Sequence, residues 1–122
     1  MEYTEFKVGE KEYKLKLGAA ETISVEKKLG ANLLNMFVKA GKDELPKLGE
    51  ILIVLHGAMQ KYEHGVTLAN VYDLYDDYID NDGSYMDLIS VLTEVLQCSG
   101  FFKKVEEVPQ EIETVDVEVR EA

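Results

Sequence analysis

The sequence predicts a small α+β domain that is mainly helical, and three observations lead to this class. Residues 3–17 alternate apolar and polar side chains around a short Gly-containing link, which indicates a β-hairpin. Between residues 19 and 102, apolar residues recur at helical spacing in four to five segments bounded by capping residues or glycines. Residues 105–122 are strongly acidic. We therefore expect one globular domain over residues 1–104, a hairpin packed on a helical bundle, followed by an acidic tail.

The hairpin is predicted from two alternating segments, Tyr3–Val8 and Tyr13–Leu17, with Gly9-Glu10 between them as the turn. Alternate side chains of a strand point to the same side, so one side of the hairpin should be buried. Its expected members are Phe6, Val8, Tyr13, Leu15 and Leu17. A two-stranded hairpin alone is marginal in water, so we expect this side to pack on the helices.

The helix boundaries are predicted from residues that start or stop helices. The expected helices are Ile23–Leu29 (capped by Thr22, stopped by Gly30), Leu33–Ala40 (opened by Asn32, ended by Gly41), Leu45–Tyr62 (Pro46 in its first turn, His64-Gly65 at its end), Leu68–Ile79 (capped by Thr67) and Tyr85–Gln97. Gly49 and Gly57 each cost the third helix about 1 kcal/mol relative to alanine, so close packing is expected to compensate.

Two helices carry a clear apolar side. The expected inward residues are Leu68, Val71, Leu74, Tyr75 and Tyr78 on the fourth helix and Leu88, Ile89, Leu92, Val95 and Leu96 on the fifth.

The charge of the chain excludes several classes of function. The formal net charge is −11, which argues against binding to nucleic acid and to anionic membrane surfaces. The N-terminal ten residues have no signal segment, and the longest apolar run, Ile51–Leu55, is too short to span a bilayer. We expect a soluble protein of the cytoplasm.

The acidic tail carries a strand-like pattern. Val115, Val117 and Val119 alternate with charged residues. Such a segment would add to the hairpin, pair with a neighbouring subunit or stay loose.

The stretch DDYIDNDG, residues 76–83, resembles a calcium-binding loop at first sight. With Gly83 at the sixth position of an EF-hand loop, Asp80 and Asp82 fall on ligand positions. The first and twelfth positions, however, are Tyr78 and Ile89, so the bidentate carboxylate that completes the cage is missing. We expect a turn, after which Asp82 or Ser84 caps the last helix.

No catalytic, metal-binding or cofactor-binding motif emerges from the remaining residues. His56 and His64 are eight residues apart, whereas helical zinc pairs are four apart. We expect His56 to be partly buried and His64 to lie at a helix end. Cys98 is the single cysteine and has no partner motif for nucleophilic catalysis, so a buried or half-buried thiol is expected. We therefore expect a protein that is not an enzyme.

Five aromatic residues are the candidates for binding a partner. These are Tyr72, Tyr75, Tyr78, Phe101 and Phe102. Helical spacing favours core packing for such residues. The other interpretation is an exposed docking surface, because aromatic side chains dominate binding hot spots.

Several phrases together carry a resemblance to a known family. In chain order they are YKLKL (13–17), VEKKLG (25–30), NLLNMF (32–37), YEHGVT (62–67), VYDLYDDY (71–78), MDLI (86–89) and SGFF (99–102). Over residues 11–102 the chain resembles the tail assembly chaperones of long-tailed phages and prophages of Gram-positive bacteria. The acidic tail lies outside the resemblance.

The resemblance implies a function without catalytic residues. Proteins of that family bind the long, apolar tape-measure protein in the cytoplasm of the bacterial host cell, keep it soluble and help to bring tail-tube subunits to it. Self-association along one client chain is compatible with such a role. The alternative is a structural tail or head-completion component that stays in the virion.

Overall fold

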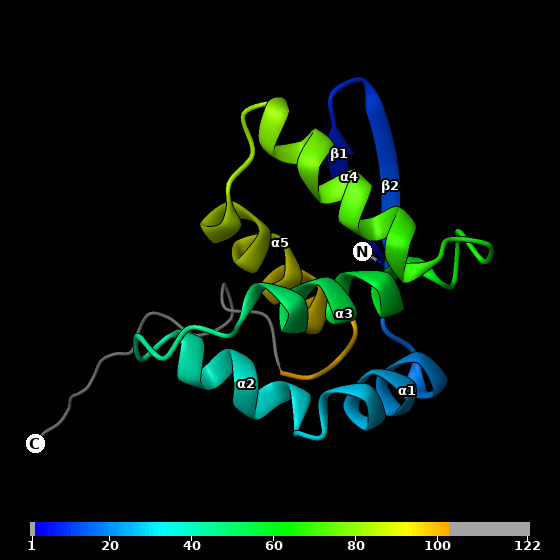
Figure 1. The fold of residues 1–122 in the computed structure, drawn as a ribbon. Helices are drawn as coiled ribbons and strands as arrows, with labels where there is room; N and C mark the ends of the chain where they lie inside the picture. The colour runs from blue at the N-terminus through cyan, green and yellow to red at the C-terminus, as the bar shows by residue number, and fades with distance from the viewer. Residues whose placement is uncertain (1, 103–122) are drawn as a thin grey trace, which may run out of the picture.

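A computed structural model describes residues 2–102, in which a two-stranded hairpin precedes five helices (Figure 1). The elements are β1 (Thr4–Val8), β2 (Lys11–Leu15), α1 (Ala19–Leu29), α2 (Leu33–Ala40), α3 (Leu48–Met59), α4 (Leu68–Asp80) and α5 (Tyr85–Cys98). The predicted class, α+β and mainly helical, is confirmed. The strand-like pattern of residues 115–119 and the domain boundary at residue 104 lie outside the described residues.

The two strands pair antiparallel through the link Gly9-Glu10. Gly9 has a φ of 63°, a positive value that suits the first central position of a two-residue link and that glycine adopts without steric cost. The register places Phe6 opposite Tyr13 and Thr4 opposite Leu15. All four side chains therefore lie on one side of the hairpin.

This side of the hairpin is the buried one, as predicted. Phe6, Val8, Leu15 and Leu17 are buried. Tyr13 is only half-buried, since it borders an open groove between the hairpin and α4. Thr4, not among the predicted residues, is buried as well. The helices therefore supply the partner surface that an isolated hairpin lacks.

Two hydrogen bonds tie the end of the hairpin to distant helices. The backbone N–H of Lys16 donates to the carbonyl of Ala58 on α3 at 2.9 Å. The N–H of Leu17 donates to Ser99 Oγ, just after α5, also at 2.9 Å. The segment that follows β2 is thus hydrogen-bonded both to α3 and to the residue that follows α5.

Helix α3 lies at the centre of the domain, with α4 on one side of it and α1 and α2 on the other (Figure 1). It contacts α1, α4, α5 and β2. Its buried residues are Ile51, Leu52, Val54, Leu55, Gly57, Ala58 and Met59. The five apolar residues predicted to face inward on α5 are all buried against the same core.

Three predicted helix starts are confirmed. The side chains of Asn32, Thr67 and Ser84 accept hydrogen bonds from backbone N–H groups three residues further on, at 2.7, 3.1 and 3.0 Å. Each bond satisfies one of the N–H groups that the first turn of a helix leaves without a partner.

The predicted start of α1 was wrong. The helix begins at Ala19, and Thr22 lies within it rather than ahead of it. Gly18 is the residue before the helix, and its N–H donates to Glu21 Oε1 at 3.0 Å. The start is therefore stabilised by a glutamate that reaches back, which is half of a capping box.

The predicted span of α3 was too long at both ends. Pro46 precedes the helix, and Lys47, whose N–H donates to Glu50 Oε1 at 2.8 Å, is the residue before its first turn. The helix ends at Met59, where the Gln60 amide donates to the carbonyls of His56 and Val66 at 3.2 and 3.1 Å. These bonds draw the following loop back over the end of the helix, so residues 60–66 do not continue it.

The two glycines of α3 have different surroundings. A Cβ placed on Gly57 would overlap Cγ2 of Val25, so the glycine allows α1 to approach α3 closely. The predicted close packing is confirmed at this position. At Gly49 a Cβ would meet no atom within 4 Å, so the same prediction was wrong there.

Candidate partner-binding surface

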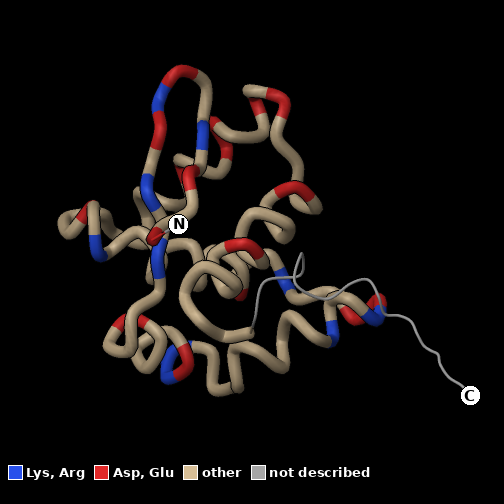
Figure 2. Tube along the Cα trace, turned by 180° about the vertical axis from the view of Figure 1, so that it is seen from behind, with Lys and Arg blue, Asp and Glu red and all other residues tan. Residues whose placement is uncertain are grey.

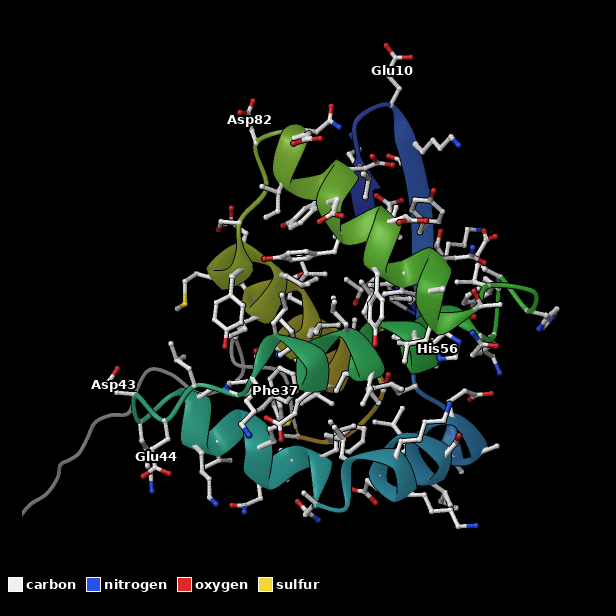
Figure 3. All side chains as sticks on the ribbon, in the orientation of Figure 1. Glu10, Phe37, Asp43, Glu44, His56 and Asp82 are labelled. Carbon is white, nitrogen blue, oxygen red and sulfur yellow. The ribbon has the colours of Figure 1, made fainter. Side chains whose placement is uncertain are left out.

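The stretch that resembles a calcium loop is divided between a helix and a turn. Residues 76–80 are the end of α4, and Asn81-Asp82-Gly83 form the predicted turn before α5. Asp82 has a φ of 72° and its side chain points away from the domain (Figure 3). Ser84, rather than Asp82, caps α5. Among residues 2–102 no group of three or more His, Cys, Asp or Glu side chains is placed to hold a metal ion.

His56 has a structural contact that accounts for its position. It is half-buried at the end of α3, and its Nε2 lies 2.9 Å from the carbonyl oxygen of Val66 (Figure 3). His64 is exposed in the loop after α3 and does not end the helix. Cys98 is half-buried at the end of α5, as expected.

Tyr78, one of the five predicted partner-binding residues, belongs to the core. Its side chain is buried, and its ring packs on Phe6 with centroids 4.9 Å apart. Burial raises the pKa of Tyr78 above its ordinary value, and the neighbouring Asp87 and Tyr75 raise it further. For Tyr78, core packing is therefore the correct interpretation and an exposed docking surface is not.

Tyr75 and Tyr72, one and two steps back along α4 from Tyr78, are progressively more exposed. Tyr72 is 49% exposed and Tyr75 is half-buried. Three residues of an α-helix rotate about 300°, so side chains at this spacing shift by about 60° around the axis. Three tyrosines at such a spacing cannot all face one way, and α4 turns Tyr78 inward and Tyr72 outward.

Phe101 and Phe102 lie against the core where the chain leaves α5. Both rings are half-buried. Gly100 has a φ of 92°, and the N–H of Phe101 donates to the carbonyl of Leu96 at 3.0 Å. These contacts fold the exit back onto the helix. Contact of either ring with a partner stays a prediction.

The structure adds two residues to the candidate surface: Ile79, which the sequence assigned to neither side, and Leu68, which was predicted to face inward and is half-buried. Leu68 and Ile79 lie with Tyr72 and Tyr75 at positions i, i+4, i+7 and i+11 of α4, so these four share one flank of the helix. Ile79 is 40% exposed. We call this set (Leu68, Tyr72, Tyr75 and Ile79) the α4 stripe. The spacing of these four residues could be seen in the sequence. The sequence did not show which flank of the helix is covered by other elements.

The start of α5 is bonded to the segment just before α3. The hydroxyl of Tyr85 donates to the carbonyl of Pro46. Burial raises the pKa of Tyr85, and Glu50 and Tyr75 raise it further. Close to Pro46 and Tyr85 in the sequence, the exposed apolar side chains are Leu45, Leu48 and Met86.

The charge of the described residues is unevenly distributed. Residues 62–102 contain no Lys or Arg, and their acidic residues are Glu63, Asp73, Asp76, Asp77, Asp80, Asp82, Asp87 and Glu94. The lysines of the described part all precede residue 62, on the hairpin, α1, α2 and the loops beside α3, as can be followed in Figure 2. The α4 stripe therefore lies on a segment of the chain that carries acidic side chains and no Lys or Arg.

The raised tyrosine pKa values predict a loss of stability in alkaline solution. Below the ordinary tyrosine pKa of 10.0, Tyr78 and Tyr85 are protonated in both the folded and unfolded chain. As the pH rises above this value, the unfolded chain releases these protons first, so stability falls until the folded pKa is passed. Urea unfolding between about pH 9 and pH 11 measures this effect.

The matched variants for this measurement are Tyr78→Phe and Tyr72→Phe. The free energy of unfolding of Tyr78→Phe should depend less steeply on pH than that of the unmodified protein. Tyr72→Phe, which alters an exposed ring, should leave the slope unchanged. Equal slopes in all three proteins would contradict the prediction.

Comparison with known proteins gives a family but no characterised relative. A family described as of unknown function, DUF6096, matches residues 3–120. No curated protein and no solved structure matches the chain. No helix within residues 2–102 is long and apolar enough to cross a membrane.

Proposed function

The chain belongs to DUF6096, a family of unknown function, and from its residues and surface we propose that it is a tail assembly chaperone of a long-tailed phage or prophage. In this proposal the protein acts in the cytoplasm of the bacterial host cell. It binds the tape-measure protein, keeps it soluble and helps to recruit tail-tube subunits, without catalysis.

The observation that carries the proposal is a set of exposed apolar side chains on α4, at the start of α5 and at the start of α3. Tyr72, Ile79, Met86 and Leu48 are each 40% or more exposed. A tape-measure protein is long, helical and apolar in stripes, so it aggregates when free. A surface of exposed aromatic and aliphatic side chains on a small folded domain suits reversible binding to such stripes.

Two of the seven phrases that carry the resemblance contribute side chains to this set. The phrase VYDLYDDY lies on α4 and supplies Tyr72, and MDLI begins with Met86 on α5. SGFF supplies Phe101 and Phe102, which are half-buried where the chain leaves α5. The resemblance and this set of exposed apolar residues thus overlap at Tyr72 and Met86.

The overall charge suits the same role. With a net charge of −11, copies bound along one client chain would repel neighbouring complexes and keep them dispersed. Several weak contacts along a long client also add up, because each bound segment raises the local concentration of the next.

Co-expression with the tape-measure protein encoded in the same phage or prophage genome tests the proposal. We expect the client to move from the pellet to the supernatant and to co-purify with the chaperone. The control is co-expression with an unrelated acidic protein of similar size, which should leave the client in the pellet. A client that stays insoluble with both proteins would refute the proposed function.

A structural component that is retained in the virion is the competing role. Mass spectrometry of purified virions separates the two roles, because a chaperone acts before the particle is complete. We expect the protein to be absent or far below the copy number of tail-tube subunits. Stoichiometric presence would favour the structural role.

A further inference from the structure

Helix α4 has one covered side and one open side. Figure 1 shows α4 crossing in front of the hairpin. Phe6 of β1 packs on Tyr78 of α4. Val71 and Tyr78 are buried on this covered side. The α4 stripe lies on the neighbouring flank, where Tyr72 and Ile79 are 49% and 40% exposed. Large apolar side chains thus remain accessible on a helix that is otherwise well packed.

The dimensions of the α4 stripe match another helix. From Leu68 to Ile79 the helix rises about 16 Å, which is three turns. Side chains at this spacing form a ridge, and a ridge packs best into the groove between side chains of a second helix. The partner segment that fits is therefore helical and carries an apolar ridge of similar length.

The border of the α4 stripe is acidic and uncompensated. Asp76 is exposed on α4 one turn after Tyr72, and Asp80 is exposed one turn after Asp76. Asp73 lies on another flank of α4, in the groove that Tyr13 of the hairpin also lines. Within residues 2–102 the only ion pair joins Lys7 and Glu12 on the hairpin, at 3.4 Å. Residues 62–102 have no Lys or Arg to neutralise these carboxylates. Positive charge on a partner would relieve their mutual repulsion and add to apolar contact.

We propose that the α4 stripe and its bordering aspartates bind an amphipathic helix whose apolar ridge is flanked by Lys or Arg. This inference rests on the proposed function and specifies which segments of a long helical client the protein selects. Apolar contact with the stripe supplies affinity, and the aspartates select basic segments over acidic ones.

A second copy of the chain fits this surface poorly. Two such surfaces placed face to face would bring Asp76 and Asp80 of both copies together, and like charges at close range oppose association. The partner is therefore a chain of opposite charge.

Three synthetic helical peptides of about 20 residues test the proposal. All three have the same length and the same spacing between the ridge residues. The first peptide has a leucine ridge flanked by lysines, and the second has the same ridge flanked by glutamates. The third has a serine ridge flanked by lysines. We expect the first peptide to bind the full chain at least about tenfold more tightly than the other two, by fluorescence anisotropy. Its advantage over the glutamate peptide should shrink at about 0.5 M salt.

Variants of the protein locate the binding surface. The double variant Tyr72→Ser/Ile79→Ser should lose most of the affinity for the lysine-flanked leucine peptide. The control is Ile23→Ser/Val38→Ser, which removes two apolar side chains from α1 and α2 that are 63% and 46% exposed and should bind normally. Circular dichroism checks that each variant keeps its helices.

A second pair of variants tests the charges. Asp76→Asn/Asp80→Asn should abolish the preference for lysine over glutamate flanks. The control Glu10→Gln/Asp43→Asn removes the same charge from exposed positions elsewhere in the domain (Figure 3), and should keep the preference.

Three results would overturn the proposal. These are equal binding of the lysine and glutamate peptides, binding that survives Tyr72→Ser/Ile79→Ser, and self-association of the free protein that this double variant abolishes. None of them decides the proposed function, which depends on whether the tape-measure protein becomes soluble. A protein that solubilises its client but binds both leucine peptides equally keeps its function and refutes this inference.

Discussion

Replacing Phe6 with alanine should lower the free energy of unfolding by about 3–5 kcal/mol, the largest effect expected of any substitution considered for this domain. The ring is 1% exposed and packs on Tyr78, with centroids 4.9 Å apart, and on Tyr13, with centroids 6.5 Å apart. Its removal deletes apolar contact and leaves a cavity where β1 meets α4. It also removes the main side chain through which the hairpin is attached to that helix.

Urea unfolding followed by circular dichroism measures this loss. Tyr72→Ala is the matched control, since it also deletes an aromatic ring from the α4 region but at a position that is 49% exposed. This control should cost about 1 kcal/mol or less. Similar losses for Phe6→Ala and Tyr72→Ala would mean that the hairpin is not held through Phe6.

Opposite effects are expected for the same substitution at two positions of α3. Gly57→Ala should destabilise the domain by about 1–3 kcal/mol, because the new methyl group overlaps the side chain of Val25. Val25 is β-branched and buried, so it has little freedom to move away. Gly49→Ala meets no atom within 4 Å and should stabilise the helix by up to about 1 kcal/mol.

A double variant links the effect at Gly57 to the α1–α3 contact. In Val25→Ala/Gly57→Ala the overlapping atom is gone, so the combined loss should be smaller than the sum of the two single losses. Urea unfolding of the two single variants, the double variant and Gly49→Ala gives all the required values. Additive losses, or destabilisation by Gly49→Ala, would contradict the packing described here.

The parts of the fold that the sequence predicted depend on local interactions. Asn32, Thr67 and Ser84 start helices through bonds to residues only three positions away, and such bonds can be foreseen from spacing alone. The hairpin was predictable for the same reason, since its alternation and its glycine link lie within one short segment.

One error was local and the others were not. Thr22 has a capping side chain and Gly18 has none, yet Glu21 reaches back three positions to Gly18 and the helix starts there. The other errors occurred where another part of the chain decides the outcome. The end of α3 depends on Gln60 and Val66 meeting across a loop. Nothing in the sequence distinguishes Gly57 from Gly49, because only the position of α1 makes one of them necessary.

The candidate surface was predictable only in part. Aromatic residues on α4 were foreseen, and their spacing already implied that Tyr72 and Tyr78 differ in direction. Which of them is exposed depends on where the hairpin packs, and Phe6 settles this by covering Tyr78. The same packing of the hairpin on the Tyr78 side of α4 leaves Ile79 exposed.

The bond between the N–H of Leu17 and Ser99 Oγ spans 82 positions of the sequence. The contact between Phe6 and Tyr78 also joins two residues that are far apart in the sequence. During translation the hairpin therefore leaves the ribosome long before its partner surface has been synthesised, and it has to wait for α5. A ribosome stalled ahead of residue 99 should hold a nascent chain that proteases cleave readily, and protection should appear only once that residue is free of the ribosome.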